Sequence, residues 1–319
     1  MIKVENLVKN FGPKIAVNDV SFSVERGEVL GFLGPNGAGK STTMRMVTGF
    51  IPPTSGRISV GGHDMLENPI PAKRLIGYLP ENAPSYADMS VQGFLGFVAE
   101  LRGMTGDAKK KAISQVVEMC MLENVLHQTI DTLSKGYRHR TCLAQSIIHD
   151  PDILIMDEPT DGLDPNQKHE VRNLIKRMGA NKAIIFSTHI LEEVDAACSR
   201  VIIIDRGKIV ANGTPDELRR RSHRAGAVSV VVSAVSAAQL SEKLGTIACV
   251  SGVETLSESP AVVRALPKSP DQKPELVRAV MEMVAQEQWK IEDLRTEEGH
   301  FDEVFRSITL PDTMKEGRA

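Results

Sequence analysis

The sequence predicts an α/β protein built on a parallel β-sheet and followed by a smaller α+β module. Four apolar runs of strand length support the sheet, and they lie at residues 28–34, 152–157, 183–188 and 200–205. Runs that are apolar on both faces are typical of parallel strands covered by helices. The segment GPNGAGKST, directly after the first run, matches the phosphate-binding pattern GxxxxGK[ST]. Together these observations predict a nucleotide-binding domain.

Other segments of this domain have different patterns. The first 27 residues, which contain IKVENLVKNF and VNDVSFSVERG, alternate in a way that predicts two short strands joined by a turn. Residues 86–130 contain no strong strand pattern and predict mostly helices. Helical spacing returns at 137–149 and 165–178, between the predicted parallel strands. We therefore expect an antiparallel β part and a helical part beside the parallel sheet.

A basic stretch, RRRSHRAG at 219–226, marks the expected end of the first domain. Basic residues at the end of a helix are most often a solvated face, so we do not expect nucleic-acid or lipid binding there. Beyond it, the patterns predict the order β-α-β-β-α-β of a ferredoxin-like module, with a closing helix in HFDEVFRSIT. The expected division is a nucleotide-binding domain at 1–220, a linker at 221–227 and an accessory domain at 228–319.

The composition argues against several classes of protein. A net charge of −3 over 319 residues gives no reason to expect a nucleic-acid partner. No apolar run approaches the ~18 residues of a membrane-spanning helix, and the amino terminus lacks a signal-peptide pattern. The four cysteines lie far apart without a CxxC motif, which favours free thiols over a zinc site or disulfides. We expect a cytoplasmic protein that reaches a membrane only through a partner.

The phosphate loop supplies the first candidate site. Glycines at 34, 37 and 39 allow backbone N–H groups to converge on phosphate oxygens, and the helix beginning near Lys40 adds its positive end. Lys40 can reach the β- and γ-phosphates, and the Ser41 hydroxyl can hold Mg²⁺. A simple glycine-rich turn would not explain a Lys-Ser pair at a helix start. The predicted phosphate-binding residues are Gly34, Pro35, Asn36, Gly37, Ala38, Gly39, Lys40, Ser41 and Thr42.

Two acids follow the predicted strand ILIMD. Asp157 can hold Mg²⁺, and Glu158 can polarise an attacking water at the γ-phosphate. His189 follows another strand, at the sheet edge where ligands bind in open α/β folds, and it can donate a hydrogen bond to the γ-phosphate. Alone, these residues would be a surface turn and a structural histidine. With the phosphate loop upstream, we predict Lys40, Glu158 and His189 as catalytic residues.

With these motifs in order, the chain resembles an ATP-binding-cassette (ABC) ATPase. The set comprises the phosphate loop, YLPE at 78–81, LSKGY at 133–137, ILIMDE at 153–158, DGLD at 161–164 and His189. A GTPase would need an NKxD motif, and NKAI at 181–184 lacks the aspartate. The resemblance covers residues 1 to about 220. It implies a P-loop NTPase with an ABC-type antiparallel β subdomain and a helical subdomain at about 86–150.

The resemblance implies further binding residues. Phe11 matches the aromatic residue that stacks on adenine, with an ordinary edge-strand aromatic as the alternative. Ser134 and Gly136 match the signature positions that touch the γ-phosphate of ATP bound by a second copy. Two substitutions within the signature, Lys135 and Tyr137 in place of the usual Gly and Gln, fall outside these main contacts.

Two other positions carry roles only by resemblance. Glu81 stands where the family usually has a glutamine that senses Mg²⁺ or water. Its carboxylate can still bind Mg²⁺ but cannot donate a hydrogen bond as an amide does. Asp164 matches an aspartate that communicates across the dimer, and the alternative is a turn before a helix.

The family mechanism implies partners and a location. Two cassettes pack head to tail, ATP closes the dimer, and closure moves helices of docked membrane subunits. IGYLPE, LSKGYRHR, DEPTDGLDPNQ and DEVFRSIT resemble the exporter class of multidrug and gliding-motility type. We expect ATP and Mg²⁺, a homodimer or paired ATPase subunit, an integral-membrane permease, no nucleic acid, and a position on the cytoplasmic face of the membrane.

Two alternatives remain at this stage. An importer ATPase is the nearer one, because some importers also carry ferredoxin-like regulatory domains. A soluble ABC protein acting on ribosomes or DNA is disfavoured, because such proteins usually carry two cassettes, long coiled coils or zinc modules. This sequence contains one copy of each motif and no cysteine cluster.

Overall fold

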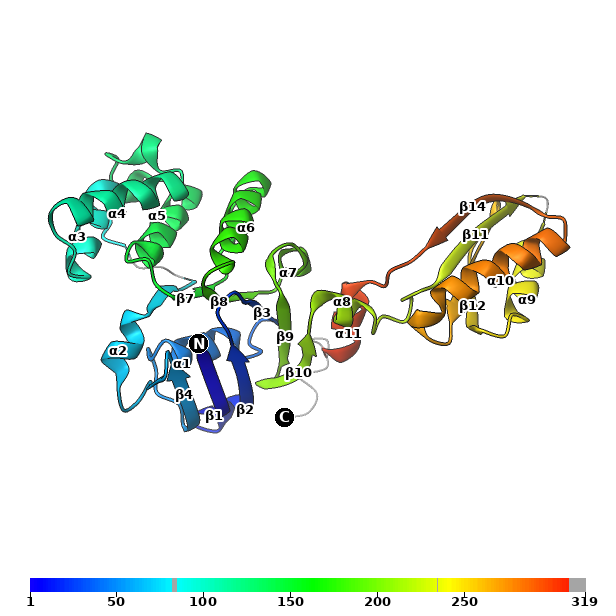
Figure 1. Cartoon of the computed structure of the whole chain (residues 1–319), viewed down its shortest axis with the longest axis horizontal. Coiled ribbons are helices and arrows are strands. Elements are labelled where there is room, and N and C mark those ends of the chain that lie inside the picture. Colours follow the sequence, from blue (N-terminus) through cyan, green and yellow to red (C-terminus); the bar gives the residue numbers. More distant parts are fainter. Residues whose placement is uncertain (82–84, 234, 310–319) are drawn as a thin grey trace. The chain divides into compact units, whose positions relative to one another are not determined.

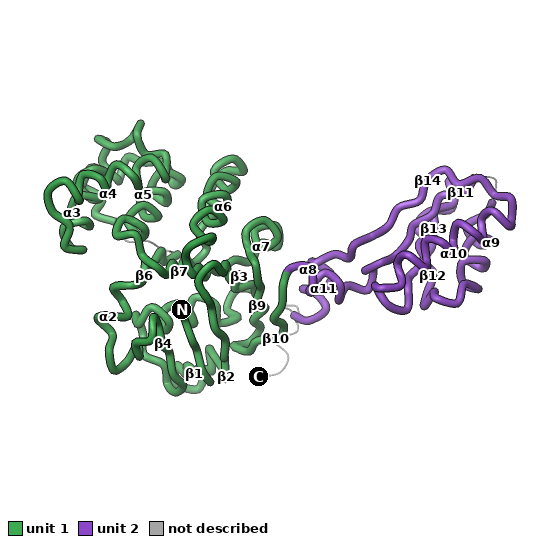
Figure 2. Tube along the Cα trace, in the orientation of Figure 1, with its two compact units in different colours: residues 1–214 green, residues 215–319 purple. Residues whose placement is uncertain are grey.

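The computed structural model describes residues 1–81, 85–233 and 235–309 of the chain (Figure 1). Contacts divide it into two compact units, 1–214 and 215–319 (Figure 2). Separate buried apolar clusters fill the two units. The division into functions expected from the sequence, with a nucleotide-binding domain at 1–220, a linker at 221–227 and an accessory domain at 228–319, remains a prediction.

The first unit is organised by a six-stranded sheet in the order β10-β9-β3-β8-β7-β6. Its strands are β3 (Val29–Leu33), β6 (Ile76–Leu79), β7 (Ile153–Asp157), β8 (Ala183–Thr188), β9 (Arg200–Asp205) and β10 (Lys208–Gly213). All neighbours are parallel except β9 and β10. The four predicted parallel strands are confirmed. The sequence patterns do not predict β6, which is short, or β10, an edge strand with three of its six residues exposed.

A second, antiparallel sheet covers part of the first unit, in the order β2-β1-β4-β5. Its strands are β1 (Ile2–Phe11), β2 (Lys14–Val24), β4 (Ser55–Val60) and β5 (His63–Asp64). Apolar residues of this sheet share one buried cluster with helix α1 (Lys40–Val47) and with alternate residues of the central strands. The predicted antiparallel β part is thus confirmed.

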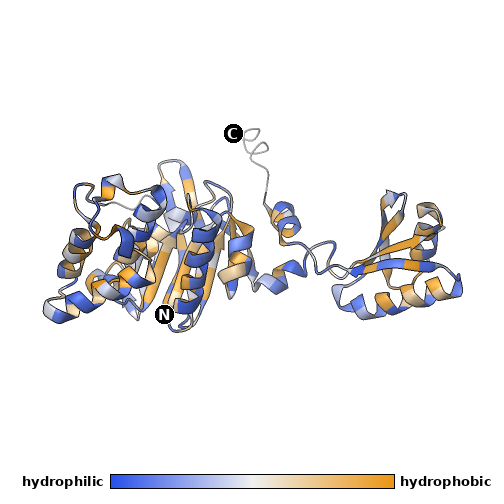
Figure 3. Cartoon of the chain, turned by 90° about the horizontal axis from the view of Figure 1, so that it is seen from above, coloured by the Kyte–Doolittle hydropathy of each residue, from blue (hydrophilic) through white to orange (hydrophobic). Residues whose placement is uncertain are grey.

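Helices lie on the opposite side of the central sheet, and most of them share a second buried apolar cluster with its strands. They are α3 (Val91–Leu101), α4 (Gly106–Met119), α5 (Lys135–Ile147), α6 (Pro165–Gly179) and α7 (Leu191–Ala197), while α2 (Pro69–Arg74) lies beside β5. Two 3₁₀ turns, Glu123–Val125 and Ile130–Thr132, connect α4 to α5. The predicted helical part is confirmed, since α3, α4 and α5 contact one another. Figure 3 shows apolar strands flanked by helices with polar outer faces.

The second unit contains the predicted order β-α-β-β-α-β. It consists of β11 (Val228–Ser233), α9 (Ala237–Gly245), β12 (Val250–Glu258), β13 (Ala261–Pro267), α10 (Lys273–Gln286) and β14 (Lys290–Thr296). Every neighbouring pair in its sheet, β12-β13-β11-β14, is antiparallel. Helix α8 (Pro215–Arg219) contacts the closing helix α11 (Phe301–Ile308). Residues 310–319 of the expected accessory domain lie outside the described residues.

Within the described part of the chain, no helix combines the length and the apolar character needed to span a bilayer. The cysteines that the structure describes form no disulfide, and Cys120, Cys142 and Cys249 are buried. Burial raises the pKa of the Cys120 thiol to about 12 and that of Cys142 to about 11, so both stay protonated.

Candidate active site

The phosphate loop joins β3 to α1 and is packed so tightly that two of its glycines cannot be replaced. A Cβ atom added to Gly34 would lie 2.3 Å from the Ile204 carbonyl oxygen. At Gly39, where φ is +112°, it would lie 2.6 Å from the Ala16 oxygen. Gly39 directly precedes the first residue of α1, Lys40. The loop therefore brings backbone N–H groups and the positive end of α1 to one place.

Lys40 is held inside this loop. Its Nζ donates to the carbonyl oxygen of Gly34 at 2.7 Å and to that of Pro35 at 3.3 Å, and it lies 3.6 Å from Glu158 Oε1. The side chain is 6% exposed. Burial lowers the pKa of Lys40, an effect that nearby Glu158 and Asp157 oppose. A phosphate group bound at the loop would supply further compensating charge for this ammonium.

Asp157, at the end of β7, is fully buried. Ser41 Oγ donates to its Oδ1 at 3.0 Å, and Ser187 Oγ donates to the same oxygen. The other oxygen, Oδ2, has no hydrogen-bond partner among the described residues. A buried carboxylate oxygen without a donor, next to a serine hydroxyl, fits the oxygen ligands that Mg²⁺ prefers.

In residues 1–81, 85–233 and 235–309, no group of three or more His, Cys, Asp or Glu side chains could hold a metal ion. Magnesium commonly binds one or two carboxylates and takes its remaining ligands from substrate phosphates and water. Ser41 and Asp157 supply one hydroxyl and one carboxylate, which suits a Mg²⁺ ion that takes its other ligands from phosphates and water.

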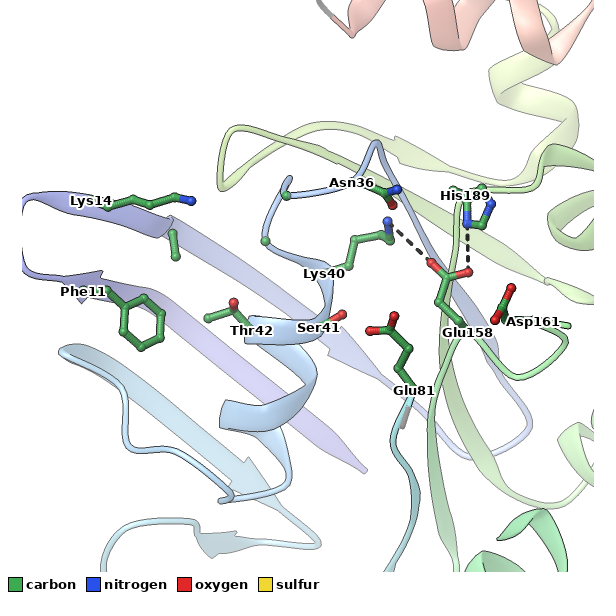
Figure 4. Close-up of a pocket in the computed structure, with 13 residues that line it drawn as sticks. Phe11, Lys14, Asn36, Lys40, Ser41, Thr42, Glu81, Glu158, Asp161 and His189 are labelled. Carbon is green, nitrogen blue, oxygen red and sulfur yellow. Dashed lines mark hydrogen bonds and ion pairs between the residues drawn. The ribbon is translucent and has the colours of Figure 1, made fainter. Parts of the chain in front are cut away.

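Glu158 connects the phosphate loop to the histidine (Figure 4). Its carboxylate lies 3.6 Å from Lys40 Nζ and 2.9 Å from His189 Nδ1. Burial raises the pKa of Glu158, although Lys40 and His189 both favour its charged form. Its φ of +51° is uncommon outside glycine, and its backbone N–H donates to Ser187 Oγ at 3.1 Å. The structure thus brings together the three residues predicted to be catalytic.

These residues open onto a cavity of about 700 Å³. Its walls contain predicted residues of all three kinds. They are the ATP-binding residues Phe11, Asn36, Gly37, Gly39, Lys40, Ser41 and Thr42, the metal-binding candidate Glu81, and the catalytic candidates Glu158 and His189. The predicted residues Gly34, Pro35 and Ala38 belong to the same loop but do not line the wall, nor does the buried Asp157. The cavity is large enough for a nucleotide-sized ligand.

Three lining residues were not predicted from the sequence: Lys14, Ala16 and Asp161. Lys14 starts β2 across the hairpin from Phe11, and only that hairpin register places it beside the cavity. Phe11 is 51% exposed, and Lys9 Nζ lies 5.2 Å from the centre of its ring. An exposed aromatic residue near cations suits stacking on a base better than packing in a core.

The signature residues lie elsewhere. Ser134 is the exposed N-cap of α5, where its Oγ accepts a hydrogen bond from Tyr137 N at 3.4 Å. Gly136 is buried, and a Cβ there would lie 2.5 Å from the Gln167 side chain. Neither Ser134 nor Gly136 lines the cavity of its own chain. The positive end of α5 is nevertheless formed as predicted.

Lys135 provides a link between the signature and the cavity. Its Nζ lies 3.0 Å from Asp161 Oδ2, and this hydrogen bond lowers the pKa of Asp161. The Lys135 stem crosses Gly162, where a Cβ would lie 2.5 Å or less from three of its atoms. Lys135, the substitution at the third signature position, is therefore accommodated by an acid and a glycine of the DGLD segment.

Asp164 caps a helix. Its Oδ1 accepts from Gln167 N at 2.9 Å, and its own backbone N–H donates to Gln167 Oε1, which together form a capping box at the start of α6. Within a single chain, this capping box explains why an aspartate stands at position 164. Its expected part in communication across a dimer stays a prediction.

Comparison with known proteins places this geometry in a family. A family profile described as ABC transporter matches residues 17–161. The chain is 37% identical over 242 residues to the linearmycin resistance ATP-binding protein LnrL of Bacillus subtilis, covering 75% of this chain and 78% of that protein. It is 36% identical over 221 residues to Nod factor export ATP-binding protein I of Burkholderia orbicola, covering 68% and 72%.

Other matches agree. The chain is 37% identical to the probable multidrug ABC transporter ATP-binding protein YbhF of Escherichia coli, but it spans only 38% of that protein's length. A solved structure described as the ATP-binding subunit of an ABC transporter superposes with a TM-score of 0.64 and 29% identity, covering 69% of this chain and 92% of that one.

Proposed function

The chain belongs to the family of ABC transporter ATP-binding proteins, and on that premise we propose that its ATPase domain powers a membrane exporter. The observation that carries the proposal is the convergence of Lys40, Glu158 and His189 on the cavity beside the phosphate loop. This arrangement combines a phosphate-binding cation at the start of α1 with a carboxylate and a histidine that directly follow strands β7 and β8. It suits the positioning of ATP and the activation of a water molecule.

Each residue has a distinct part in the proposed reaction. Lys40 and the loop N–H groups hold the β- and γ-phosphates of ATP, and Phe11 stacks on the adenine. Glu158 orients the attacking water and accepts a proton from it. His189 holds the Glu158 carboxylate through Nδ1, which leaves its other ring nitrogen available for the γ-phosphate.

Magnesium completes the proposal. Ser41, Asp157 and Glu81 are the residues that would hold Mg²⁺, directly or through water, with the phosphate oxygens of ATP. When bound, the ion neutralises charge on the phosphates. Asp157 Oδ2 accepts no hydrogen bond from any described residue, which supports its assignment as a Mg²⁺ ligand.

A second copy, or a paired ATPase subunit, completes the site through its signature. Ser134 is exposed and Gly136 forms the first turn of α5, yet neither reaches the cavity of its own chain. We assign both to the γ-phosphate of ATP bound by the other subunit. Because ATP then binds the closed dimer better than the open one, it shifts the population toward closure.

The names of the relatives support export. One relative is named for linearmycin resistance, one as a probable multidrug transporter protein and one for Nod factor export. We extend this role to the present chain, with an integral-membrane permease as its partner and a position on the cytoplasmic face of the membrane. Dimer closure would then be transmitted to the permease through the helical part around α3 to α5.

Two measurements test the proposal. The purified chain should hydrolyse ATP in the presence of Mg²⁺, and the Glu158→Gln variant should bind ATP without turnover. The chain and its permease, reconstituted together in vesicles with the ATPase outside, should move substrate into the vesicle lumen when ATP is added. Movement in the opposite direction would replace the exporter with an importer, and a chain that never hydrolyses ATP would overturn both.

A further inference from the structure

One buried carboxylate close to the cavity has no part in the reaction proposed above. Glu193, in α7, is only 1% exposed, although ionisable side chains are rarely buried to this extent. Its neighbour Glu192 lies in the same first turn of the helix and is exposed. The helix dipole favours an acid at either position. It therefore does not explain why Glu193 in particular is buried.

Two threonine hydroxyls hold the Glu193 carboxylate. Thr188 Oγ1 donates to Oε2 at 2.6 Å, and Thr160 Oγ1 donates to Oε1. Both threonines are buried as well, at 0% and 2% exposure. A buried carboxylate is unfavourable unless its oxygens are hydrogen-bonded. The two hydroxyls therefore supply the hydrogen bonds that make burial of the Glu193 carboxylate possible.

The two threonines belong to the two segments that carry the reacting side chains. Thr160 follows Glu158 by two residues, and Thr188 directly precedes His189. Thr188 Oγ1 also accepts a hydrogen bond from the Ile190 backbone N–H at 3.0 Å, so the residues on both sides of His189 share one hydroxyl. Through Glu193, the segment after β7 is fastened to the segment after β8.

We propose that Glu193 is a positioning residue for ATP hydrolysis, which maintains the Glu158–His189 contact by joining Thr160 to Thr188. This inference rests on the proposed roles of Glu158 and His189. Their side chains meet at 2.9 Å, between strands that end in separate loops. A displacement of about 1 Å in either loop is enough to break such a contact, and misplacements of this size can slow catalysis by about a hundredfold.

The first test compares two neighbouring glutamates. Glu193→Gln keeps the length of the side chain, but its amide nitrogen accepts no hydrogen bond, so one of the two contacts is weakened. We expect kcat to fall about tenfold while the Kd for ATP changes by less than about twofold. Glu192→Gln, on the exposed face of the same turn, should leave both unchanged. A kcat for Glu193→Gln within twofold of that control would overturn the proposal.

A second variant guards against a folding defect at Glu193. Thr160→Val keeps the shape of the threonine and removes one of the two hydroxyl donors, without changing a residue that lines the cavity. It should lower kcat in the same direction, again with unchanged ATP affinity. Unchanged kcat in a folded Thr160→Val protein would contradict the proposed link.

A double-mutant cycle separates positioning from general loss of stability. In a His189→Ala background, the contact that Glu193 is proposed to maintain is already absent. Glu193→Gln should then lower single-turnover hydrolysis by less than about twofold. A full tenfold loss in that background would show that Glu193 acts through something other than His189.

Failure of this inference can be told apart from failure of the proposed function. If the wild-type chain hydrolyses ATP and Glu158→Gln does not, the roles proposed for the cavity hold. If Glu193 and Thr160 variants then behave like the wild type, only the positioning role is removed.

Discussion

The start of α1 and the start of α5 are both helix amino termini proposed to face phosphate, but the chain surrounds them differently. Lys40, at the first, is buried and contacts Gly34, Pro35 and Glu158. Ser134, at the second, is exposed, and its hydroxyl only caps its own helix. One terminus therefore belongs to a cavity within this chain. The other has the backbone geometry for an anion, but its residues Ser134 and Gly136 do not line that cavity.

This difference explains why a signature sequence can tolerate substitutions that a phosphate loop cannot. Replacing Gly34 or Gly39 would place a Cβ within 2.6 Å of a backbone oxygen. Lys135, in contrast, extends across Gly162 to an acid, and its side chain is 69% exposed. Packing restricts the first terminus. At the second, packing restricts Gly136, where a Cβ would lie 2.5 Å from the Gln167 side chain, but it leaves Lys135 exposed.

The largest loss of hydrolysis is expected from a change beside the buried start of α1. Glu158→Gln removes the group proposed to accept the proton of water, and we expect kcat to fall by about a thousandfold or more. ATP binding should remain, because Lys40 and the loop N–H groups are unchanged. Steady-state hydrolysis and equilibrium binding of a fluorescent ATP analogue measure the two quantities separately. Near-wild-type hydrolysis would remove the proposed role of Glu158.

The next effect tests the exposed terminus. Ser134→Asp keeps an N-cap residue, so α5 should stay intact. The new carboxylate would repel a γ-phosphate supplied by a second copy, and we expect hydrolysis to fall about a hundredfold. Ser236→Asp makes the same change at the N-cap of α9, in the other unit, and serves as the matched control. Equal activities of the two variants would argue against a phosphate at Ser134.

The dependence of kcat on pH tests the role proposed for Glu158 beside the start of α1. Burial raises the pKa of Glu158 above its ordinary value of 4.5, and only the ionised carboxylate can accept a proton. The acid limb of kcat should therefore begin above pH 4.5, and below the pKa the rate should fall about tenfold per pH unit. Single-turnover rates at saturating ATP measure this limb. An acid limb at or below pH 4.5 would contradict the effect of burial.

The smallest loss of hydrolysis is expected from breaking the ion pair that joins Lys135, in the signature, to Asp161, in the cavity wall. Lys135 and Asp161 are 69% and 56% exposed, and such pairs contribute only about 0.2–1 kcal/mol. Lys135→Met should thus lower hydrolysis by no more than about fivefold, through loosening of the cavity wall at Asp161. Lys243→Met breaks the exposed contact with Glu287 in the second unit and should have no effect. A loss for Lys135→Met as large as that for Ser134→Asp would mean that Lys135 contacts ATP itself.

The parts of this site that the sequence predicts are those whose chemistry is local. The Lys-Ser pair at a helix start and the Asp-Glu pair after a strand each indicate a role within a few residues. Lys14 and Asp161 are different, because the β1–β2 hairpin register and the turn after β7 bring them to the cavity. The contact of Glu193 with Thr160 joins residues 33 positions apart in the sequence, and no periodicity indicates it.

The same distinction holds for the fold. Buried parallel strands are apolar throughout, so β3, β7, β8 and β9 are visible in the sequence. In the edge strand β10, the apolar residue Val210 is exposed and its neighbours Ile209 and Ala211 are partly or fully buried, so the sequence shows no alternation of apolar and polar residues. Its position follows from pairing with β9 rather than from its own residues.

Of the two arrangements proposed for the shared ATP site, we expect the one formed by two copies of this chain. The most direct measurement is the solution mass of the Glu158→Gln protein, by light scattering after size exclusion, with and without ATP. We expect monomers without ATP, dimers with it, and monomers in both cases once Ser134→Asp is added. A Glu158→Gln protein that binds ATP as a monomer, or a double variant that still dimerises with ATP, would contradict it.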